Sequence, residues 1–394
     1  MSVLPSRAEQ CTIPTVPGRA KRGALRLVVL HLALFGAAGC SSNDEASPAP
    51  AAVDAQVVDV VDNPMEDAPG LDDVMNSPSD TDPIALDAAV DATSSDAAPA
   101  TCATVPCPAG QVCVGSACVT PPSCPDSKER GCAFVSLPGG TFTMGEVGAN
   151  AATPLQTNIT VGPYTLDAHE VTVARFRRFW NAGRPAPTSA MAYQAGSIAW
   201  AGTVREPVRT TTMKECNWSS MSGARDAHPM NCLDWWTAQA FCAWDGGRLP
   251  TEAEYEWASR GRAVASLPVP RTYPWGNETG SPGCDRAQWN FCPGDDTATT
   301  RRVGSFAATP DVFDLAGNVR EWMADSYAAY TDTKCWGGIA RTNPLCSLGA
   351  TSLRGYRGGS WCSTTLDTLK VAARYTRSPT SPTDFLGFRC ARNR

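Results

Sequence analysis

One cysteine beside a Gly-Gly-Ser turn is the residue of this chain best placed to do chemistry. The stretch "RGGSWC" puts Ser360 and Cys362 just after the turn, and "LGFRC" adds Cys390 near the C-terminus. A thiolate can attack an electrophile or bind a soft metal ion. Cys362 therefore has three interpretations: an unreactive thiol, a disulfide partner, and a nucleophile or single metal ligand.

The sequence offers no evident partner for a catalytic thiol. A cysteine nucleophile needs a base, which is often a histidine. The histidines are His31, His169 and His228. His31 lies in an apolar N-terminal segment, His169 precedes an expected helix and His228 precedes a proline. Structural roles are favoured for the last two, although the fold could still bring a histidine to the thiol.

The N-terminus and the cysteine content indicate export. The 17 cysteines suit an oxidising compartment. A basic front and a short apolar run, 27–35, form a secretory signal that is too short to span a membrane. "AAGC" resembles a bacterial lipobox, which implies a signal peptide at 1–39 and lipidation of Cys40; ordinary cleavage is the alternative. The serines after Cys40 resemble the outer-membrane sorting pattern, so we expect a lipid-anchored protein of the outer membrane or cell surface of a Gram-negative bacterium.

The charge is unevenly distributed along the chain. Residues 1–39 carry +4 and residues 41–100 carry −14, so the total of −6 leaves +4 for the remainder. An Ala/Asp/Pro-rich acidic segment has too little apolar surface to fold, so residues 40–100 are predicted to be a disordered tether. The mild positive charge of the remainder is not clustered, which argues against nucleic acid as a partner.

A cysteine-rich segment follows at 101–133, with cysteines at 102, 107, 113, 118, 124 and 132. So short a segment cannot bury a core, so disulfides must stabilise it. Spacing alone does not determine the pairing; our working choice is 102–113, 107–118 and 124–132. Zinc is the alternative, but there is no C-x-x-C pair and the compartment is oxidising. The segment resembles the small EGF-like modules of secreted proteins.

Residues 134–394 contain all 12 tryptophans and only short periodic stretches. "FVSLPGGTFTMG" predicts two short strands around a Gly-Gly turn. Helices are predicted after Thr172 and after Asp234, with Gly246 ending the second. A third is predicted after Thr251, which forms a capping box with Glu254. We therefore expect an irregular α+β domain with little regular secondary structure.

Seven motifs in a fixed order then identify a family. They are "LPGGTFTMG", "HEVTVARFRRF", "HPMNCLDWWTAQAFCAWDGGRLPTEAEYEWASRG", "YPWGN", "DLAGNVREW", "RGGSW" and "LGFRCAR". Together they cover about 260 residues and resemble the formylglycine-generating enzyme, or sulfatase-modifying factor, family. The resemblance implies a C-type-lectin-like fold for 134–394, in which tryptophans fill the spaces between short elements.

The catalytic members of that family oxidise a cysteine of an unfolded sulfatase to formylglycine, using oxygen and a copper(I) ion held by two cysteines. Two soft thiolates suit linear Cu(I). Placed on the family pattern, Cys362 lies one residue before the first copper position, which Ser363 occupies, and no cysteine stands at the second. Arg320 replaces a tryptophan of the site wall, and Phe385 replaces an asparagine. We therefore expect no copper and no catalytic residue, with Cys362 and Ser360 as the nearest candidates.

The resemblance also implies disulfides. The family pairs the cysteine of its "AFC" helix with that of "GFRC", here Cys242 and Cys390. A second family bridge is missing at both ends, where Ser259 and Val371 stand. Nearest-neighbour pairing of the remaining cysteines gives 216–232, 284–292 and 335–346, that is Cys216, Cys232, Cys284, Cys292, Cys335 and Cys346. Of the cysteines after Cys40, this leaves Cys362 over.

Calcium is a further expectation that comes from the resemblance. The family's turn before "WEW" binds calcium through side-chain and backbone oxygens. The matching residues here are Asp314, Leu315, Gly317, Val319 and Glu321, and a weaker second site would use Asp295. Carboxylate oxygens on an irregular loop suit this hard cation; a turn bonded to itself is the alternative.

Two functions from different classes follow. The first is a non-catalytic surface module that binds a peptide, a glycan or a cell-envelope protein. The second is an oxygen-dependent oxidase of the family with an altered site. Loss of the paired copper cysteines favours the binding module, and so does the lipid tether, because formylglycine is made on chains that have not yet folded.

Overall fold

The computed structural model describes residues 102–394 except 103–104, 106, 115, 147–154, 209–212, 214, 262–270, 291, 296–298, 310 and 337–340. The predicted signal peptide and tether, with Cys40, lie outside the described residues. Those that are described belong to one unit of the chain. Within them, no helix combines the length and the apolar character needed to cross a membrane.

The helices begin where the sequence places their caps. They are α1 (Val173–Asn181), α2 (Trp235–Trp244) and α3 (Glu252–Arg260), with a single 3-10 turn, η1 (Leu366–Leu369). Thr172, Asp234 and Thr251 each accept a hydrogen bond from the backbone N–H three residues further on. Glu254 completes the capping box by accepting from the Thr251 N–H at 2.8 Å. The three helices expected from the sequence are confirmed.

The strands of the described chain are short and belong to several small sheets. The largest sheet has four strands in the order β14 (Tyr375–Arg377), β13 (Arg354–Arg357), β11 (Arg320–Ser326), β15 (Leu386–Gly387). Two sheets have three strands each: one has the order β12 (Arg341–Thr342), β5 (Gln156–Val161), β4 (Gly140–Met144), and the other has the order β16 (Ala391–Asn393), β6 (Tyr164–Asp167), β3 (Phe134–Leu137). The remaining strands form pairs: β1 (Val112–Val114) with β2 (Ala117–Val119), β9 (Ala307–Thr309) with β10 (Val312–Phe313), and β7 (Met191–Tyr193) with β8 (Gly196–Ile198). The irregular α+β fold expected from the sequence is confirmed.

The two strands expected around the first Gly-Gly turn exist but do not pair with each other. β3 pairs with β6 and β4 pairs with β5, so the two lie in different sheets. Gly139 has φ 73°, and a Cβ there would lie 2.1 Å from the Val161 carbonyl oxygen. The turn therefore packs tightly against the end of β5. It leads β4 into a different sheet from β3, whereas in a hairpin the two strands would pair.

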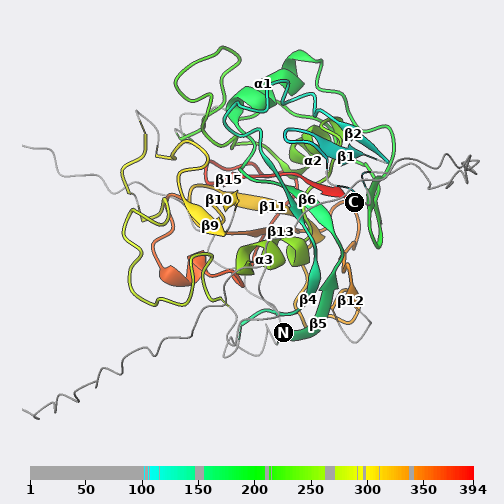
Figure 1. Ribbon diagram of the computed structural model, residues 1–394, viewed down its shortest axis with the longest axis vertical. Helices are drawn as coiled ribbons and strands as arrows, with labels where there is room; N and C mark the ends of the chain where they lie inside the picture. Colours follow the sequence, from blue (N-terminus) through cyan, green and yellow to red (C-terminus); the bar gives the residue numbers. More distant parts are fainter. Residues whose placement is uncertain are drawn as a thin grey trace, which may run out of the picture. The chain divides into compact units, whose positions relative to one another are not determined.

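The four-stranded sheet lies at the centre of the domain. α3 contacts β11 and β13, while α2 contacts β11, so the sheet lies between these helices (Figure 1). α2 is buried over its first eight residues. Aromatic rings fill the space between α1 and α2: Phe176 lies 5.9 Å from Phe241, and Phe179 lies 5.7 Å from the same ring. Ring packing therefore replaces long regular elements as the source of the core.

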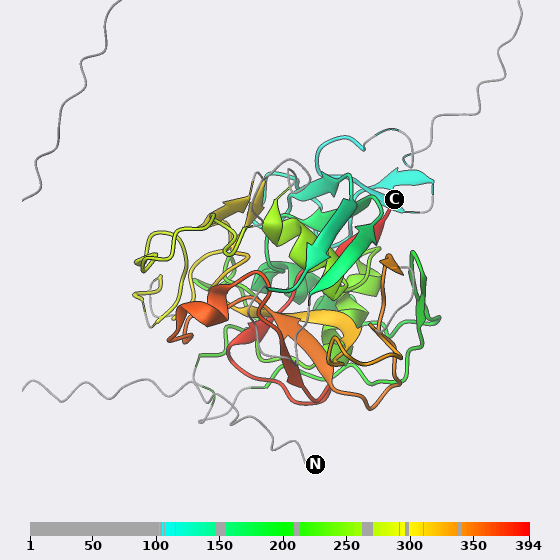
Figure 2. The ribbon, with the colours of Figure 1, turned by 90° about the horizontal axis from the view of Figure 1, so that it is seen from below.

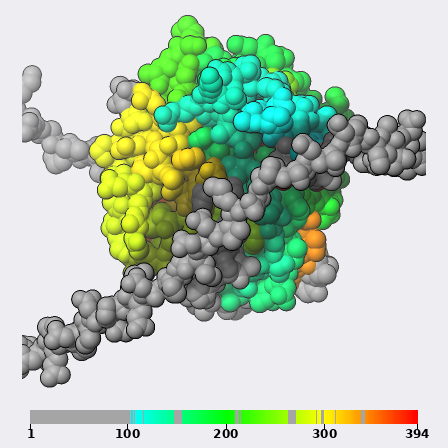
Figure 3. All heavy atoms as spheres, viewed as in Figure 1, coloured from blue at the N-terminus to red at the C-terminus, as the bar shows by residue number. Residues whose placement is uncertain are grey.

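The cysteine-rich segment packs directly on this core. The β1–β2 hairpin lies beside the C-terminus (Figure 2), where β1 contacts β16. In the space-filling view the segment, in cyan, lies against green residues of the domain (Figure 3). Beneath it, Arg175 and Arg392 alternate with Asp167 and Asp245 in a fully buried ring of ion pairs, with N–O distances of 2.6–2.9 Å. Ser123 joins the ring, donating its N–H to Asp245 and accepting from the Arg175 Nε.

Seven disulfides stabilise the described chain: 102–113, 107–118, 124–132, 216–232, 242–390, 284–292 and 335–346. These pairs coincide with those expected from the sequence. Cys362 is also disulfide-bonded, although it belongs to none of the seven. The seven pairs use all the other cysteines after Cys40 and leave Cys362 over among them, as expected. Of its three interpretations, that of a disulfide partner fits the bond.

Candidate functional site

The segment after β13 forms a tight turn that carries the candidate cysteine. The Ser360 N–H donates to the Ser363 Oγ at 3.0 Å, and the Ser363 N–H donates back to the Ser360 carbonyl at 2.9 Å. Both serines and Trp361 are buried, whereas Cys362 is half-buried. The Ser360 Oγ lies 3.4 Å from the Cys362 Sγ. The turn thus holds the Cys362 sulfur beside the Ser360 hydroxyl.

The two glycines are needed for steric reasons. Gly358 has φ 74°, and a Cβ there would lie 2.8 Å from the Tyr255 hydroxyl. A Cβ on Gly359 would lie 2.1 Å from a methyl group of Leu369, in η1. The chain can therefore pass between α3 and η1 only without side chains at these positions. The tight packing of the two glycines therefore determines the positions of Ser360 and Cys362.

Arg320 fills the space beside the same sheet. It lies on β11 with 2% of its surface exposed, and its guanidinium carbon is 4.3 Å from the ring centre of Tyr375, 5.3 Å from that of Phe385 and 5.7 Å from that of Tyr356. The Arg320 N–H also donates to the Phe385 carbonyl at 2.9 Å. Cation–π contacts on buried rings are among the stronger ones. Arg320 is thus packed among these three aromatic rings.

The structure gives the two described histidines structural contacts. The His228 Nδ1 lies 2.9 Å from the Thr300 Oγ1. His169 stacks on Phe313 with ring centres 4.9 Å apart. Burial, with nearby Arg389, lowers the pKa of His169 from 6.5 to about 4. His169 is therefore neutral at physiological pH and packs as an aromatic ring.

The carboxylates of the expected calcium turn already have partners. Asp314 accepts the backbone N–H groups of Gly304 and Phe306. Glu321 forms a fully buried bidentate pair with Arg389, with N–O distances of 2.7 and 2.8 Å. A guanidinium thus lies where a cation would have to approach Glu321.

The other expected calcium positions also serve the turn itself. The Leu315 carbonyl accepts from the Tyr255 hydroxyl at 3.0 Å, and the Val319 N–H donates to Glu170 at 3.2 Å. At Gly317, a Cβ would lie 2.5 Å from a neighbouring carbonyl oxygen. Asp295 accepts the Arg302 N–H at 2.8 Å. These contacts agree with the alternative of a turn bonded to itself, and calcium binding stays an untested prediction.

Two residues that organise this turn, Glu170 and Arg389, were not among the predicted site residues. Glu170 is fully buried and accepts from the Asn318 side-chain amide at 2.7 Å. Burial, together with Asp314 and Glu321, raises the pKa of Glu170. Arg389 is the main positive charge facing these carboxylates. Both residues lie inside motifs that were quoted, "HEVT" and "GFRC", but nothing in the sequence showed that the two motifs meet.

Comparison with known proteins supports the same assignment as the motifs. A family model described as "Sulfatase-modifying factor enzyme 1-like domain" matches residues 121–394. The chain belongs to the sulfatase-modifying factor family. The match begins inside the cysteine-rich segment, so the 124–132 bridge lies within the matched region.

Relatives of this sulfatase-modifying factor chain include enzymes and a protein named inactive. "Inactive C-alpha-formylglycine-generating enzyme 2" of Bos taurus is 31% identical over 289 residues, covering 66% of this chain and 87% of the relative. "Formylglycine-generating enzyme" of Streptomyces coelicolor is 31% identical over 302 residues, covering 65% and 88%. Among solved structures, PvdO from Pseudomonas aeruginosa is 24% identical with a TM-score of 0.46, covering 66% and 94%.

Among the described residues of the sulfatase-modifying factor domain, no pair of free thiols stands at the Cys362 turn. A linear copper(I) site needs two thiolates. Cys362 is disulfide-bonded, Ser363 contributes a hydroxyl, and every other described cysteine belongs to one of the seven pairs. In the described part of the chain, the one group of three or more His, Cys, Asp or Glu ligand atoms within 4.8 Å of one another is Cys102, Cys107 and Cys118. Cys362 belongs to no such group.

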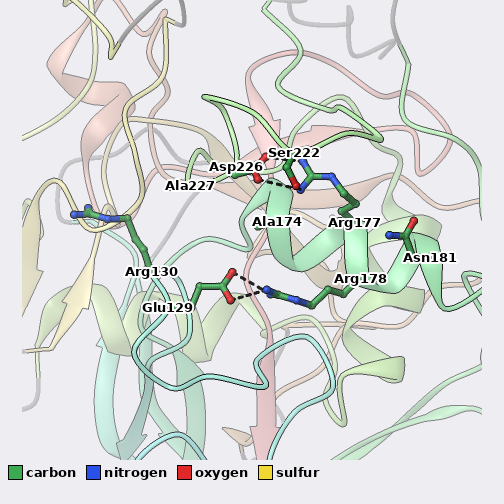
Figure 4. A pocket seen from close by; sticks show the side chains of 9 residues that line it. All are labelled: Glu129, Arg130, Ala174, Arg177, Arg178, Asn181, Ser222, Asp226 and Ala227. Atoms are coloured by element: carbon green, nitrogen blue, oxygen red, sulfur yellow. Dashed lines mark hydrogen bonds and ion pairs between the residues drawn. The ribbon is translucent and has the colours of Figure 1, made fainter.

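Three cavities of the sulfatase-modifying factor domain lie on surfaces that do not include this turn. Their volumes are about 360, 430 and 510 Å³, within the range of ligand sites. The first lies between α1 and the cysteine-rich segment. Figure 4 shows two ion pairs in its wall, Arg177 with Asp226 and Arg178 with Glu129. Each arginine is bound to its carboxylate by two hydrogen bonds, so the charges of this wall largely neutralise one another.

Proposed function

We propose that this chain is an exported, lipid-anchored protein whose sulfatase-modifying factor domain binds a partner and does not oxidise cysteine. The observation that carries the proposal is Ser363. Its buried hydroxyl is bonded to the Ser360 N–H at 3.0 Å, in the position that the family pattern assigns to the first copper thiolate. A hydroxyl is a hard, protonated donor and a poor ligand for Cu(I).

The residue at the position of the family's site-wall tryptophan supports the same proposal. Arg320, packed against Tyr375 and Phe385, takes space where the family pattern has a tryptophan. The Bos taurus relative, which is named inactive, supports the idea that this fold can persist without the oxidase activity.

The expected partners are the membrane, through lipid on Cys40, and a peptide, glycan or cell-envelope protein bound by the domain. Residues 101–394 carry a surplus of +4, without the clustering that nucleic acid would require. Affinity purification of envelope fractions with the purified domain would identify the partner.

The decisive experiment combines copper binding with product analysis. The purified protein is titrated with Cu(I) against a competing chelator, and oxygen uptake is followed with a Cys-x-Pro-x-Arg sulfatase peptide. We expect no stoichiometric copper, no oxygen uptake and no formylglycine by mass spectrometry. The enzyme of Streptomyces coelicolor is the positive control.

Cys362→Ser is the matched variant for the same assay. We expect it to behave like the parent protein. A formylglycine signal that disappears in Cys362→Ser would overturn the proposal in favour of the oxygen-dependent oxidase with an altered site.

A further inference from the structure

We propose that the cavity between α2 and the segment that follows α1 binds a neutral saccharide. Its volume is about 510 Å³, and it is lined by residues 185–192 together with Ala243, Trp244 and Gly247. The inference rests on the proposed binding function, because it names the class of partner. It concerns a surface that does not include the Cys362 turn.

The lining of this cavity disfavours a charged ligand. None of the residues that line it carries a charged side chain, whereas arginines and a carboxylate line each of the cavities of about 360 and 430 Å³. Arg184, the arginine just before the lining segment, lies over the Trp180 ring, 4.3 Å from its centre. A charged group that entered the cavity would lose water without gaining an ion-pair partner. The ligand should therefore be uncharged.

One wall offers hydrogen-bonding groups that the protein itself does not use. Among the described residues, none forms a hydrogen bond with the backbone of 185–190 or with the hydroxyl groups of Thr188 and Ser189. Pro185 and Pro187 have no N–H, but the other residues of this stretch have one each, and a hydroxyl group both donates and accepts. A saccharide, whose hydroxyl groups also donate and accept, can pair with all of these groups.

Trp244 supplies an aromatic surface in the same cavity. It is half-buried at the end of α2, with its ring centre 5.5 Å from that of Phe179 and 5.9 Å from that of Phe241. These contacts hold the ring in place, while its exposed part lines the cavity. The C–H face of a pyranose ring packs on an indole, and the indole N–H can donate to a sugar hydroxyl. The cavity thus combines the apolar and the polar contacts that a sugar ring requires.

The site is formed before the ligand arrives. The rings of Pro185 and Pro187 fix their φ angles at about −65°, and the stretch is anchored by α1 before it and by the buried Met191 of β7 after it. Little conformational entropy is therefore lost on binding. The same prolines lie two residues apart, so one edge of the stretch lacks two successive donors for a peptide strand. This makes a saccharide a better occupant than an added strand.

The test titrates the full chain by isothermal calorimetry. The probes are maltotriose, cellotriose and N,N′,N″-triacetylchitotriose, with trigalacturonic acid as a charged counterpart. We expect at least one neutral trisaccharide to bind with one site per chain. Its affinity should be the same at low and high salt, because no ion pair forms. Trigalacturonic acid should not bind.

Two variants assign the site. Trp244→Ala should lower the affinity for the neutral trisaccharide by about tenfold or more, whereas Trp275→Ala, which removes another half-buried tryptophan, should not change it. Because Trp244→Ala also removes packing on Phe179 and Phe241, the double variant T188V/S189A provides a second measurement. Both of its residues are exposed, so the fold is retained, and we expect a severalfold loss of affinity.

The inference is wrong if no neutral trisaccharide binds, if trigalacturonic acid binds equally well, or if Trp244→Ala and T188V/S189A both retain the parent affinity. The copper and formylglycine assays test the proposed function separately. Absence of saccharide binding together with absence of formylglycine would overturn the inference alone and leave a binding module with another partner.

Discussion

At the scale of single residues, His169 should make stability depend on pH. Its pKa is about 4 in the folded protein and 6.5 in the unfolded chain, so between these values the unfolded chain binds the additional proton. Its contribution to stability is present above pH 6.5 and is lost as the pH falls to 4. Asp314 and Asp325, whose pKa values burial raises to about 6 and about 7, act in the opposite direction.

The His169→Phe variant isolates the histidine from those carboxylates. Phenylalanine can keep the stack on Phe313, and the His169 Nδ1 makes no hydrogen bond among the described residues. Urea unfolding of both proteins between pH 4.5 and 7.5 should show the variant gaining relative stability as the pH falls. Curves that run parallel over this range would contradict the assignment of a buried neutral imidazole.

The contacts of Arg320 show what a sequence can and cannot reveal about the site. The motif around Cys362 located the candidate turn and the missing thiolate directly. The stack of Arg320 on Tyr375, Phe385 and Tyr356 was not predictable, because the four side chains come from four separate segments around one sheet. The ion pair of Glu321 and Arg389 was missed for the same reason, and it is what weakens the calcium expectation.

At the scale of secondary-structure elements, the capping box of α3 shares Glu254 with an ion pair, so two variants can separate the two contributions to stability. Thr251→Ala removes one capping hydrogen bond and should lower the free energy of unfolding by about 1 kcal/mol. Glu254→Gln also breaks the buried bidentate pair with Arg248, whose N–O distances are 2.6 and 2.7 Å, and should cost about 3–5 kcal/mol. Chemical denaturation of both variants measures the difference; equal losses would show that the cap alone matters.

Elements with local signals were predictable, and those that depend on distant pairing were not. Caps and glycines placed all three helices because their hydrogen bonds join residues a few positions apart. The strands are too short for a period-2 pattern, so the separation of β3 and β4 into two sheets left no trace in the sequence. Only the motif order, and not periodicity, conveyed the irregular sheet architecture.

At the scale of the whole molecule, the cysteine-rich segment is joined to the domain by buried charge. Arg175 donates to the Ser123 Oγ and, at 3.0 Å, to the Gly131 carbonyl, and each of these residues is the neighbour of one cysteine of the Cys124–Cys132 bridge. Residues of the segment thus complete a network whose other members come from α1, β6, the end of α2 and β16. The family match likewise begins within this segment, at residue 121, although the sequence suggested a boundary near 133.

The disulfide that closes the longest loop should contribute most to the stability of the domain. Cys242 and Cys390 are fully buried and join α2 to the C-terminal segment across a sequence separation of 148, whereas Cys284 and Cys292 are separated by 8. Loop-closure entropy assigns about 5 kcal/mol to the long loop and about 2.5 kcal/mol to the short one. We expect C242A/C390A to lose about twice the unfolding free energy that C284A/C292A loses, as measured by urea unfolding under non-reducing conditions. Equal losses would mean that chain entropy does not govern these bridges and that local packing around each pair does.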